Sequence, residues 1–190
     1  MLMLEYSHMI KNNSAQHLRS SLRKISSTHY LLVIALAIQI IVYDAGRLIT
    51  PTTVLQRWTA LSLLTSVITF VWYVSRNQAT KLDVLKRLTA TLVLADIAYD
   101  SFSVYAQRGM ASRAVILYLV PIITAAIIGR KSAIFGAAAL SVSAYVTTAV
   151  AYFVLNFNEG YKIELYGEVG FYAVLFVILS SMIWTVCKKA

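Results

Sequence analysis

The stretch YLLVIALAIQIIVYDAGRLI, residues 30–49, decides the fold class because it is apolar over a length that can cross a bilayer. A transmembrane helix needs about 20 consecutive, mainly apolar residues. Of the 190 residues in the chain, 59% are hydrophobic and 13% are charged, whereas soluble domains carry about 25% charged residues. The sequence therefore predicts an all-α integral membrane protein.

Further apolar stretches separate the charged residues, so the sequence predicts a bundle of six transmembrane helices. The expected spans are residues 30–49, residues 58–75, the segment between Arg87 and Arg108, and residues 114–129, 133–155 and 167–187. The short segment GRKS joins spans four and five in an expected antiparallel hairpin. In it, Gly129 is expected to end one helix and Ser132 to cap the next.

Basic residues are distributed unequally between the loops. If the N-terminus lies in the cytoplasm, the cytoplasmic segments hold most of the 17 lysines and arginines. The positive-inside rule then predicts that both termini are cytoplasmic in a multi-pass protein of the plasma membrane, the inner membrane of a bacterium. The net charge of +9 is explained by these loops, so no nucleic-acid partner is expected.

The segment 1–28 precedes the first span and is expected to be a short, basic amphipathic helix on the inner leaflet. Apolar residues repeat along one helical face beside basic ones: Leu18, Leu22, Ile25, Arg19, Arg23 and Lys24. Such a helix buries its apolar face in the membrane surface. A partly disordered basic lead is the alternative. The predicted organisation is this segment, a six-helix domain over residues 29–187 and a cytoplasmic tail over residues 188–190.

Two aspartates, Asp96 and Asp100, lie one helical turn apart inside the third span. At 1.5 Å per residue, this span covers roughly 30 Å, which places Asp96 near the bilayer midplane and Asp100 about 6 Å nearer the outside. A charge at the centre costs roughly 2.5 to 3.5 kcal/mol. Two like charges one turn apart cannot both ionise cheaply. At least one carboxyl group is therefore expected to be protonated or paired with a cation.

These acids predict an outward-facing polar pocket that senses or binds a ligand, because ionisable residues within a membrane are functional by default. The expected site residues are Asp96, Asp100, Tyr99, Arg113, Tyr118 and Pro121. The expected charge or hydrogen-bond partners are Tyr43, Asp44, Arg47 and Arg108. Asp44 and Arg47 are also close enough in sequence to pair with each other. A set of interhelical polar bonds that only fixes the bundle is the alternative.

Two features predict how the helices pack. Pro121 lies near the middle of span four, where it lacks an N–H and leaves the carbonyl of Leu117 without its usual partner, so a kink is expected. Span five carries small residues at a spacing of four, which lets two helix backbones approach closely. The face expected to contact another helix contains Gly136, Ala139, Ser143 and Thr147.

The region from Asp96 to about Tyr145 resembles the six-helix N-terminal sensor regions of bacterial histidine kinases of the redox-responsive RegB/PrrB type. It shares an aspartate in span three, the glycine-containing loop QRGMASR and the sequence LYLVPIITAAIIGRKSAIFGAAALSVSAY. The resemblance implies a sensor whose last span continues as a signalling helix. The family's quinone binding attaches to a loop with two glycines and a proline. Here Gly109 is the one glycine, and Arg113 stands where proline is expected. The residues identify no cofactor, and a quinone rests on the resemblance alone.

The favoured function is the membrane-embedded input domain of a bacterial two-component histidine kinase. Its expected partners are the lipid bilayer, a second copy of the chain and a downstream cytoplasmic kinase or output domain. The alternative is a small proton- or cation-coupled transporter or channel that uses Asp96 and Asp100.

An enzyme is disfavoured. A DxxxD pair is only half of the metal motif of CDP-alcohol phosphotransferases, and neither GxSxG nor HExxH is present. The histidines lie at or before the first span, so no metal site is expected.

Overall fold

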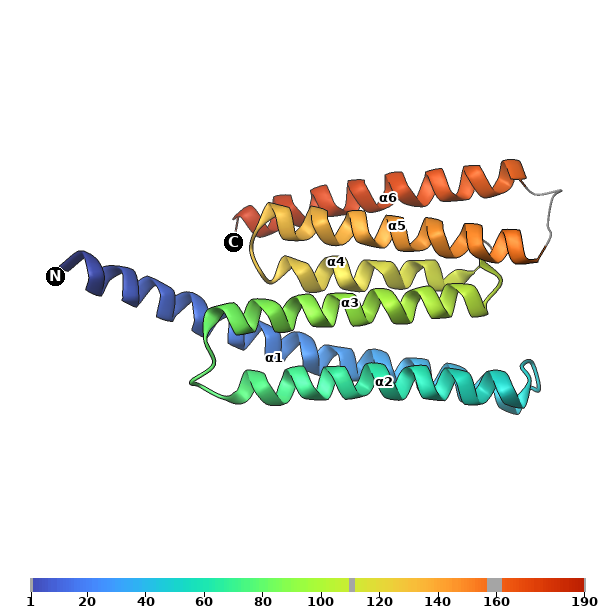
Figure 1. The fold of residues 1–190 in the computed structure, drawn as a ribbon, viewed down its shortest axis with the longest axis horizontal. Helices are drawn as coiled ribbons and strands as arrows, with labels where there is room; N and C mark the ends of the chain where they lie inside the picture. Colours follow the sequence, from blue (N-terminus) through green and yellow to red (C-terminus); the bar gives the residue numbers. More distant parts are fainter. Residues whose placement is uncertain (1, 110–111, 157–161, 190) are drawn as a thin grey trace. The chain divides into compact units, whose positions relative to one another are not determined.

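The computed structural model describes residues 2–109, 112–156 and 162–189, in which every regular element is helical. The fold is therefore all-α, as predicted. In order, the elements are α1 (Leu2–Ala45), α2 (Pro51–Arg76), α3 (Leu82–Ala106), the 3-10 helix η2 (Arg113–Tyr118), α4 (Leu119–Ala126), α5 (Lys131–Leu155) and α6 (Lys162–Lys189), as labelled in Figure 1 except for η2.

Four helices are long and apolar enough to cross a membrane, which supports the expected membrane protein. They cover Ser14–Ala45, Pro51–Arg76, Lys131–Leu155 and Glu164–Lys188. The helical segment Arg113–Ala126 is apolar but shorter. Helix α3 has the length of a span, and its two buried aspartates lower its hydropathy. The count of six spans thus stays a prediction.

The chain folds as two compact units, residues 1–92 and residues 93–190, and the division falls within α3. In the first unit, α1 and α2 lie side by side and run in opposite directions (Figure 1). Local chemistry fixes the start of α2, because the Thr50 hydroxyl accepts a hydrogen bond from the Thr53 N–H at 3.3 Å. Pro51 occupies the first helical turn, where its missing N–H has no consequence.

The expected interfacial helix is not a separate element, because α1 runs without a break from Leu2 to Ala45. No glycine or proline interrupts residues 14–45. The apolar stripe predicted for this segment is packed, since Leu18 is 5% exposed and Leu22 is fully buried. The basic residues beside it bond to the chain that follows α2: the Arg19 Nη2 donates to the carbonyl oxygens of Gln78 at 2.7 Å and Thr80 at 3.1 Å.

Replacement of Arg19 by methionine, which keeps most of the side-chain length, tests this anchor. We expect the free energy of unfolding to fall by about 1 to 2 kcal/mol, because hydrogen bonds from charged donors contribute about 1.5 to 3 kcal/mol and these two are partly exposed. Thermal unfolding in detergent, followed by circular dichroism, measures the change. Arg87→Met is the control, because Arg87 is exposed on α3. Equal losses in both variants would contradict the anchoring role.

In the second unit, α4 and α5 form the predicted tight hairpin. Gly129 ends the first helix as expected, with a φ of +67° and its N–H bonded to the Ala126 carbonyl at 2.9 Å. The expectation that Ser132 caps α5 is wrong. The N-cap position is Arg130, in extended conformation and without a side-chain hydrogen bond. Ser132 lies one residue inside the helix, because α5 begins directly after Arg130, at Lys131.

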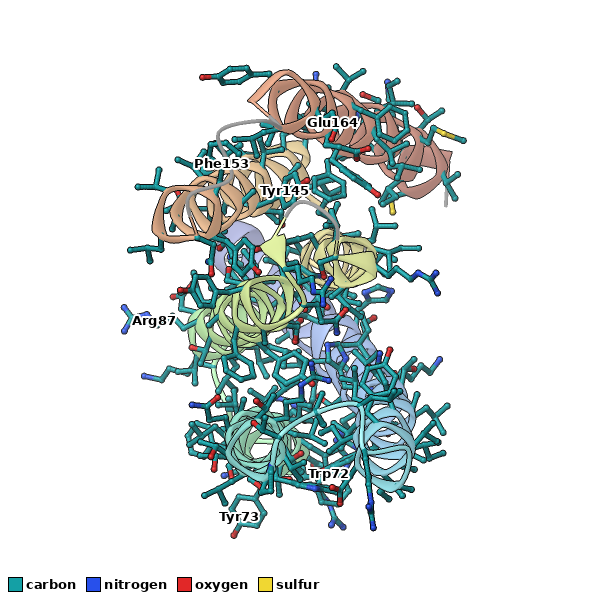
Figure 2. The ribbon with its side chains drawn as sticks, turned by 90° about the vertical axis from the view of Figure 1, so that its right-hand side faces the viewer. Trp72, Tyr73, Arg87, Tyr145, Phe153 and Glu164 are labelled. Atoms are coloured by element: carbon teal, nitrogen blue, oxygen red, sulfur yellow. The ribbon has the colours of Figure 1, made fainter. Side chains whose placement is uncertain are left out.

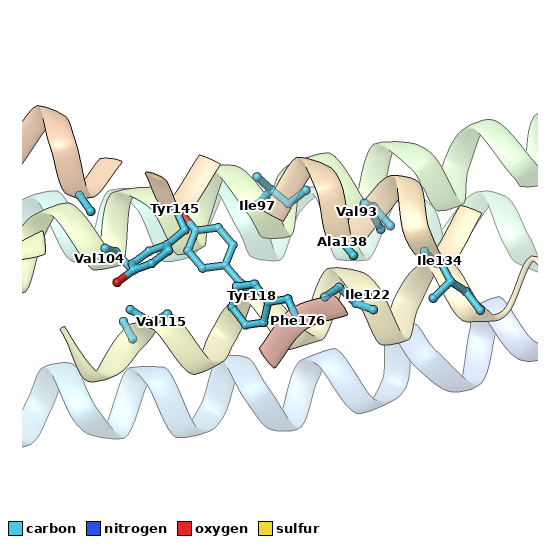
Figure 3. Packing of buried hydrophobic residues seen from close by; sticks show 14 of the residues in the cluster. Val93, Ile97, Val104, Val115, Tyr118, Ile122, Ile134, Ala138, Tyr145 and Phe176 are labelled. Carbon is cyan, nitrogen blue, oxygen red and sulfur yellow. The ribbon is translucent and has the colours of Figure 1, made fainter. Parts of the chain in front are cut away.

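The core of the second unit joins α3, η2, α4, α5 and α6 (Figure 3). Its fully buried large side chains include Val104, Val115, Tyr118, Ile122, Ile134 and Tyr145. Phe176 of α6 completes an aromatic cluster in which its ring centroid lies 6.2 Å from that of Tyr118. The centroids of Tyr118 and Tyr145 are 6.1 Å apart in an edge-on arrangement. Aromatic rings favour such contacts because their edges are positive and their faces negative.

The small-residue face predicted on α5 does not pack against the described residues of the second unit. Its members are all exposed: Gly136, Ala139, Ser143 and Thr147. The neighbouring face packs instead, through Ile134, Ala137, Ala138, Ser141, Tyr145 and Ala149. A Cβ atom added to Gly136 would meet no atom within 4 Å. The contact of this face with another helix therefore stays a prediction.

Candidate functional site

The two aspartates lie on one face of α3 and are both buried. Asp96 is 2% exposed and Asp100 is 3% exposed. Residues four apart on a helix are neighbours on its surface, and Ser103, 7% exposed, extends the same polar side by one turn. The Oδ2 atom of Asp100 is buried without a hydrogen-bond partner among the described residues. An unsatisfied buried carboxylate oxygen is costly, so this position needs a reason beyond packing.

A hydrogen-bond relay beside Asp100 connects η2 to α3. The Ser101 hydroxyl donates to the Ile97 carbonyl at 2.8 Å and lies 2.9 Å from the Tyr118 hydroxyl oxygen. Because a serine hydroxyl has one proton, the Tyr118 O–H is the donor in the second bond. Tyr118 thereby holds its hydroxyl next to the residue that follows Asp100. Ser101 was not among the predicted site residues.

Tyr118 is a predicted site residue that is fully buried in the core, where its ring meets Tyr145 and Phe176 (Figure 3). Tyr145 points from α5 into the interior, whereas Tyr73 of the first unit points away from its helix (Figure 2). The Tyr145 hydroxyl is buried without a hydrogen-bond partner among the described residues. The buried polar groups of this unit therefore include the hydroxyls of Tyr118 and Tyr145 as well as the two acids.

The predicted kink at Pro121 is replaced by a change of helix type. Residues 113–118 form the 3-10 helix η2, and α4 begins at Leu119. Pro121 therefore lies in the first turn of α4, where a missing N–H breaks no intrahelical hydrogen bond. The Leu117 carbonyl accepts a bond from the Leu119 N–H. Pro121 is buried, and it lies just after the continuous helical segment Arg113–Ala126 changes from 3-10 to α-helix.

The basic residues expected near the acids lie at the surface. Arg113 opens η2 and is exposed, and Arg108 is exposed with a φ of +74°. Neither forms a salt bridge with Asp100 in the described chain, where the ion pair found joins Lys86 to Asp83 at 3.9 Å. Tyr99 is half-buried on α3.

The partners proposed from span one belong to the first unit. The Arg47 N–H donates to the Asp44 carbonyl at 2.9 Å, a backbone link, and their side chains form no ion pair within the described residues. Tyr43 instead carries the Arg57 guanidinium 5.5 Å from its ring centroid. The pairing of Tyr43, Asp44 or Arg47 with the buried aspartates stays a prediction.

The chemistry available in the second unit is that of carboxyl and hydroxyl groups in an apolar setting. Among the described residues, no three histidine, cysteine, aspartate or glutamate side chains come together as a metal site would require. Carboxyl and hydroxyl groups of this kind can hold a proton, accept a cation or bias the packing of the helices around them.

The fold and these buried groups define an all-helical protein whose long apolar helices can cross a membrane and whose apolar interior holds two carboxyl groups. Comparison of the chain with protein-family models, curated proteins and solved structures finds no match.

Proposed function

We propose that this chain is the membrane-embedded input domain of a bacterial two-component histidine kinase. The observation that carries the proposal is the burial of Asp96 and Asp100, one turn apart on α3. Carboxyl groups are expensive in an apolar interior and mark functional positions in membrane helices. The resemblance of the region from Asp96 to Tyr145 to the RegB/PrrB-type sensor regions supports the same class.

The proposed topology has six spans, in which α3 and the segment formed by η2 and α4 also cross the plasma membrane, with both termini in the cytoplasm. The distribution of basic residues supports this orientation. The proposed active form is a homodimer. The exposed small-residue face of α5 supports this, because close helix approach in lipid relies on small residues.

In the proposed mechanism, a ligand or a change in the membrane favours one of two packings of the helices around the acidic pair. The Ser101–Tyr118 hydrogen bond couples α3 to η2, and the aromatic contact of Tyr118 with Phe176 couples η2 to α6. A shift in α6 would then pass to a downstream cytoplasmic output domain. The stimulus must interact differently with the two packings, since otherwise it shifts no population.

Neutralisation of the acids tests this proposal. The chain is fused to the cytoplasmic part of a histidine kinase, and phosphorylation of the response regulator is measured at acidic and neutral external pH and with an oxidised or reduced quinone pool. Asp96→Asn and Asp100→Asn are expected to change the response at least about fivefold, because removal of a buried carboxyl group that can gain or lose a proton biases a two-state equilibrium by about 1 kcal/mol or more.

Asp83→Asn is the matched control, because the Asp83 side chain is 87% exposed. It should leave the response unchanged. If the fusion responds to neither condition, or if the two buried variants fold and respond as the control does, the acidic pair takes no part in signalling and the proposal fails.

A proton- or cation-coupled transporter or channel is the second candidate. The observation that favours it is the buried Asp100 Oδ2, which has no hydrogen-bond partner in the described chain and could take up a proton or a cation during transport. Measurement of proton or cation flux into proteoliposomes at varied pH distinguishes a transporter or channel from a sensor. Flux that Asp100→Asn abolishes and Asp83→Asn preserves would establish the transporter, and absence of flux would remove it.

A further inference from the structure

A basic pocket lies at one end of the first unit, remote in sequence from the acidic pair. It has a volume of about 680 Å³ and is lined by Gln16, Arg19, Ser20, Arg23 and Lys24 of α1 together with Gln78, which follows α2. The five α1 residues fall at spacings of three, four, seven and eight, so they share one helical face. None of the lining residues is acidic.

The cations of this pocket are held in place by the end of α2. The Arg19 Nη2 bonds to the carbonyls of Gln78 and Thr80, and the Arg23 Nε donates to the Ser75 carbonyl at 3.3 Å. Carbonyl groups at a helix C-terminus lack partners within the helix and attract positive charge. These bonds fix the guanidinium groups without neutralising them, because a carbonyl carries no net charge.

Most of the donors on these side chains are left for a ligand. A guanidinium group has five N–H donors, and Arg23 uses only its Nε in the described bonds. The Arg19 Nε is buried and has no hydrogen-bond partner among the described residues. Lys24 is exposed. None of the three cations forms a salt bridge with a described carboxylate. Three cations with free donors and no acid around one cavity are complementary to an anion.

The pocket lies at the edge of the apolar part of the first unit. Lys24 precedes the apolar stretch that begins at Tyr30, and Gln78 follows the last residue of α2. Trp72 and Arg76 lie near the same end of the apolar part on α2, and the Arg76 guanidinium is 4.8 Å from the Trp72 ring centroid. Tryptophan and arginine are enriched where a helix leaves the hydrocarbon. Lipid headgroups are found at this depth.

We infer that this pocket binds a phosphate group. Guanidinium groups match phosphate because their planar arrangement of donors allows paired hydrogen bonds to its oxygens, and lysine adds a point charge. The phosphate can belong to the headgroup of an anionic lipid, which the location of the pocket favours, or to a soluble phosphate. Basic pockets between membrane helices bind anionic headgroups by this chemistry.

Titration of the detergent-solubilised full chain with short-chain lipids tests the inference. Short-chain phosphatidylglycerol, a short-chain diacylglycerol that has no phosphate, and inorganic phosphate are titrated separately, and the dissociation constants are measured by calorimetry. The double variant Arg23→Gln/Lys24→Gln is expected to bind phosphatidylglycerol about thirtyfold more weakly, because each cation contributes about fivefold. Arg19 is left unchanged, since its bonds support the fold.

Lys86→Gln/Arg87→Gln is the matched control. It removes two positive charges, as the pocket variant does, but from a lysine and an arginine that are adjacent in sequence and do not line the pocket. Figure 2 shows Arg87 pointing away from its helix. Circular dichroism establishes that both double variants are folded.

Binding of phosphatidylglycerol that the pocket variant loses and the control keeps supports a headgroup site. The same pattern with inorganic phosphate alone supports a soluble ligand. If neither phosphate probe binds more tightly than the phosphate-free diacylglycerol, or if both double variants weaken binding equally, the pocket is no phosphate site and the inference is wrong.

Discussion

Replacement of Tyr118 by alanine is expected to lower the free energy of unfolding by about 3 to 5 kcal/mol, the usual cost of removing a fully buried aromatic ring. Tyr118 has no exposed surface, and its ring contacts Tyr145 and Phe176. The variant loses these contacts and leaves a cavity where η2 meets α5 and α6. It also leaves the Ser101 hydroxyl without the donor that lies 2.9 Å away. Thermal unfolding in detergent, followed by circular dichroism, measures the loss.

Two conservative variants separate the ring of Tyr118 from its hydroxyl. Tyr118→Phe keeps the ring and should cost only about 0.5 to 1.5 kcal/mol, because Ser101 still donates to the Ile97 carbonyl. Ser101→Ala should likewise cost about 0.5 to 1.5 kcal/mol, because it removes the Ser101–Tyr118 hydrogen bond while Thr148 remains a partner of the Tyr118 hydroxyl. An equal loss in Tyr118→Phe and Tyr118→Ala would show that packing of the ring is unimportant.

The positions of most helices could be predicted because they depend on local composition. The predicted span 58–75 lies within α2, and the predicted span 133–155 lies within α5, which covers Lys131–Leu155. In both helices, charged or loop-forming residues bound an apolar stretch, and that information is contained in the sequence itself. The glycine that ends the helix before α5 was predictable for the same reason, since Gly129 adopts a left-handed conformation at no steric cost.

The helix faces that pack against other helices could not be predicted. The spacing of residues in the sequence shows which of them share a face, but it does not show which other helix that face contacts. The stripe from Gly136 to Thr147 has the spacing of a helix contact and is exposed, while the stripe from Ala138 to Ala149 is buried. Small residues occur on both faces of α5, so composition does not choose between them. The choice is made by the large side chains of other helices, such as Phe176.

The apolar sequence around the two aspartates indicated that they would be buried. It did not indicate which side chains would lie next to them. Ser101 and Tyr118 are separated by 17 residues and by the turn after α3. Their contact depends on where that turn directs η2, which no local pattern specifies. The change of helix type near Pro121 could not be predicted for a related reason. A proline inside an apolar run predicts a kink, whereas the start of α4 at Leu119 places Pro121 in the first turn of α4.

Gly109, in the turn after α3, gives the second large prediction: Gly109→Ala should lower the free energy of unfolding by about 2 to 4 kcal/mol. Its φ is +63°, a conformation that costs residues with a Cβ about 1 to 2 kcal/mol. A Cβ placed there would also lie 2.9 Å from both the Cβ and the Cδ1 of Tyr152 on α5. The Cβ of Tyr152 moves only with the α5 backbone, so rotation of the side chain cannot relieve the overlap.

The turn at Gly109 matters because it holds the end of α3 against α5. Tyr105, in the last turn of α3, packs edge-on against Tyr152 with ring centroids 5.6 Å apart, and the clash would separate these rings. Gly136→Ala is the matched control on α5. Its new Cβ meets no atom within 4 Å, so the variant should be unchanged or more stable by about 0.5 to 1 kcal/mol.

Thermal unfolding of the two alanine variants in the same detergent compares them directly. Opposite signs are expected, because Gly109 combines a left-handed φ with close contact and Gly136 has neither. If both alanine variants changed the free energy of unfolding by the same amount, the change would result from the loss of a glycine and not from the geometry of the turn at Gly109.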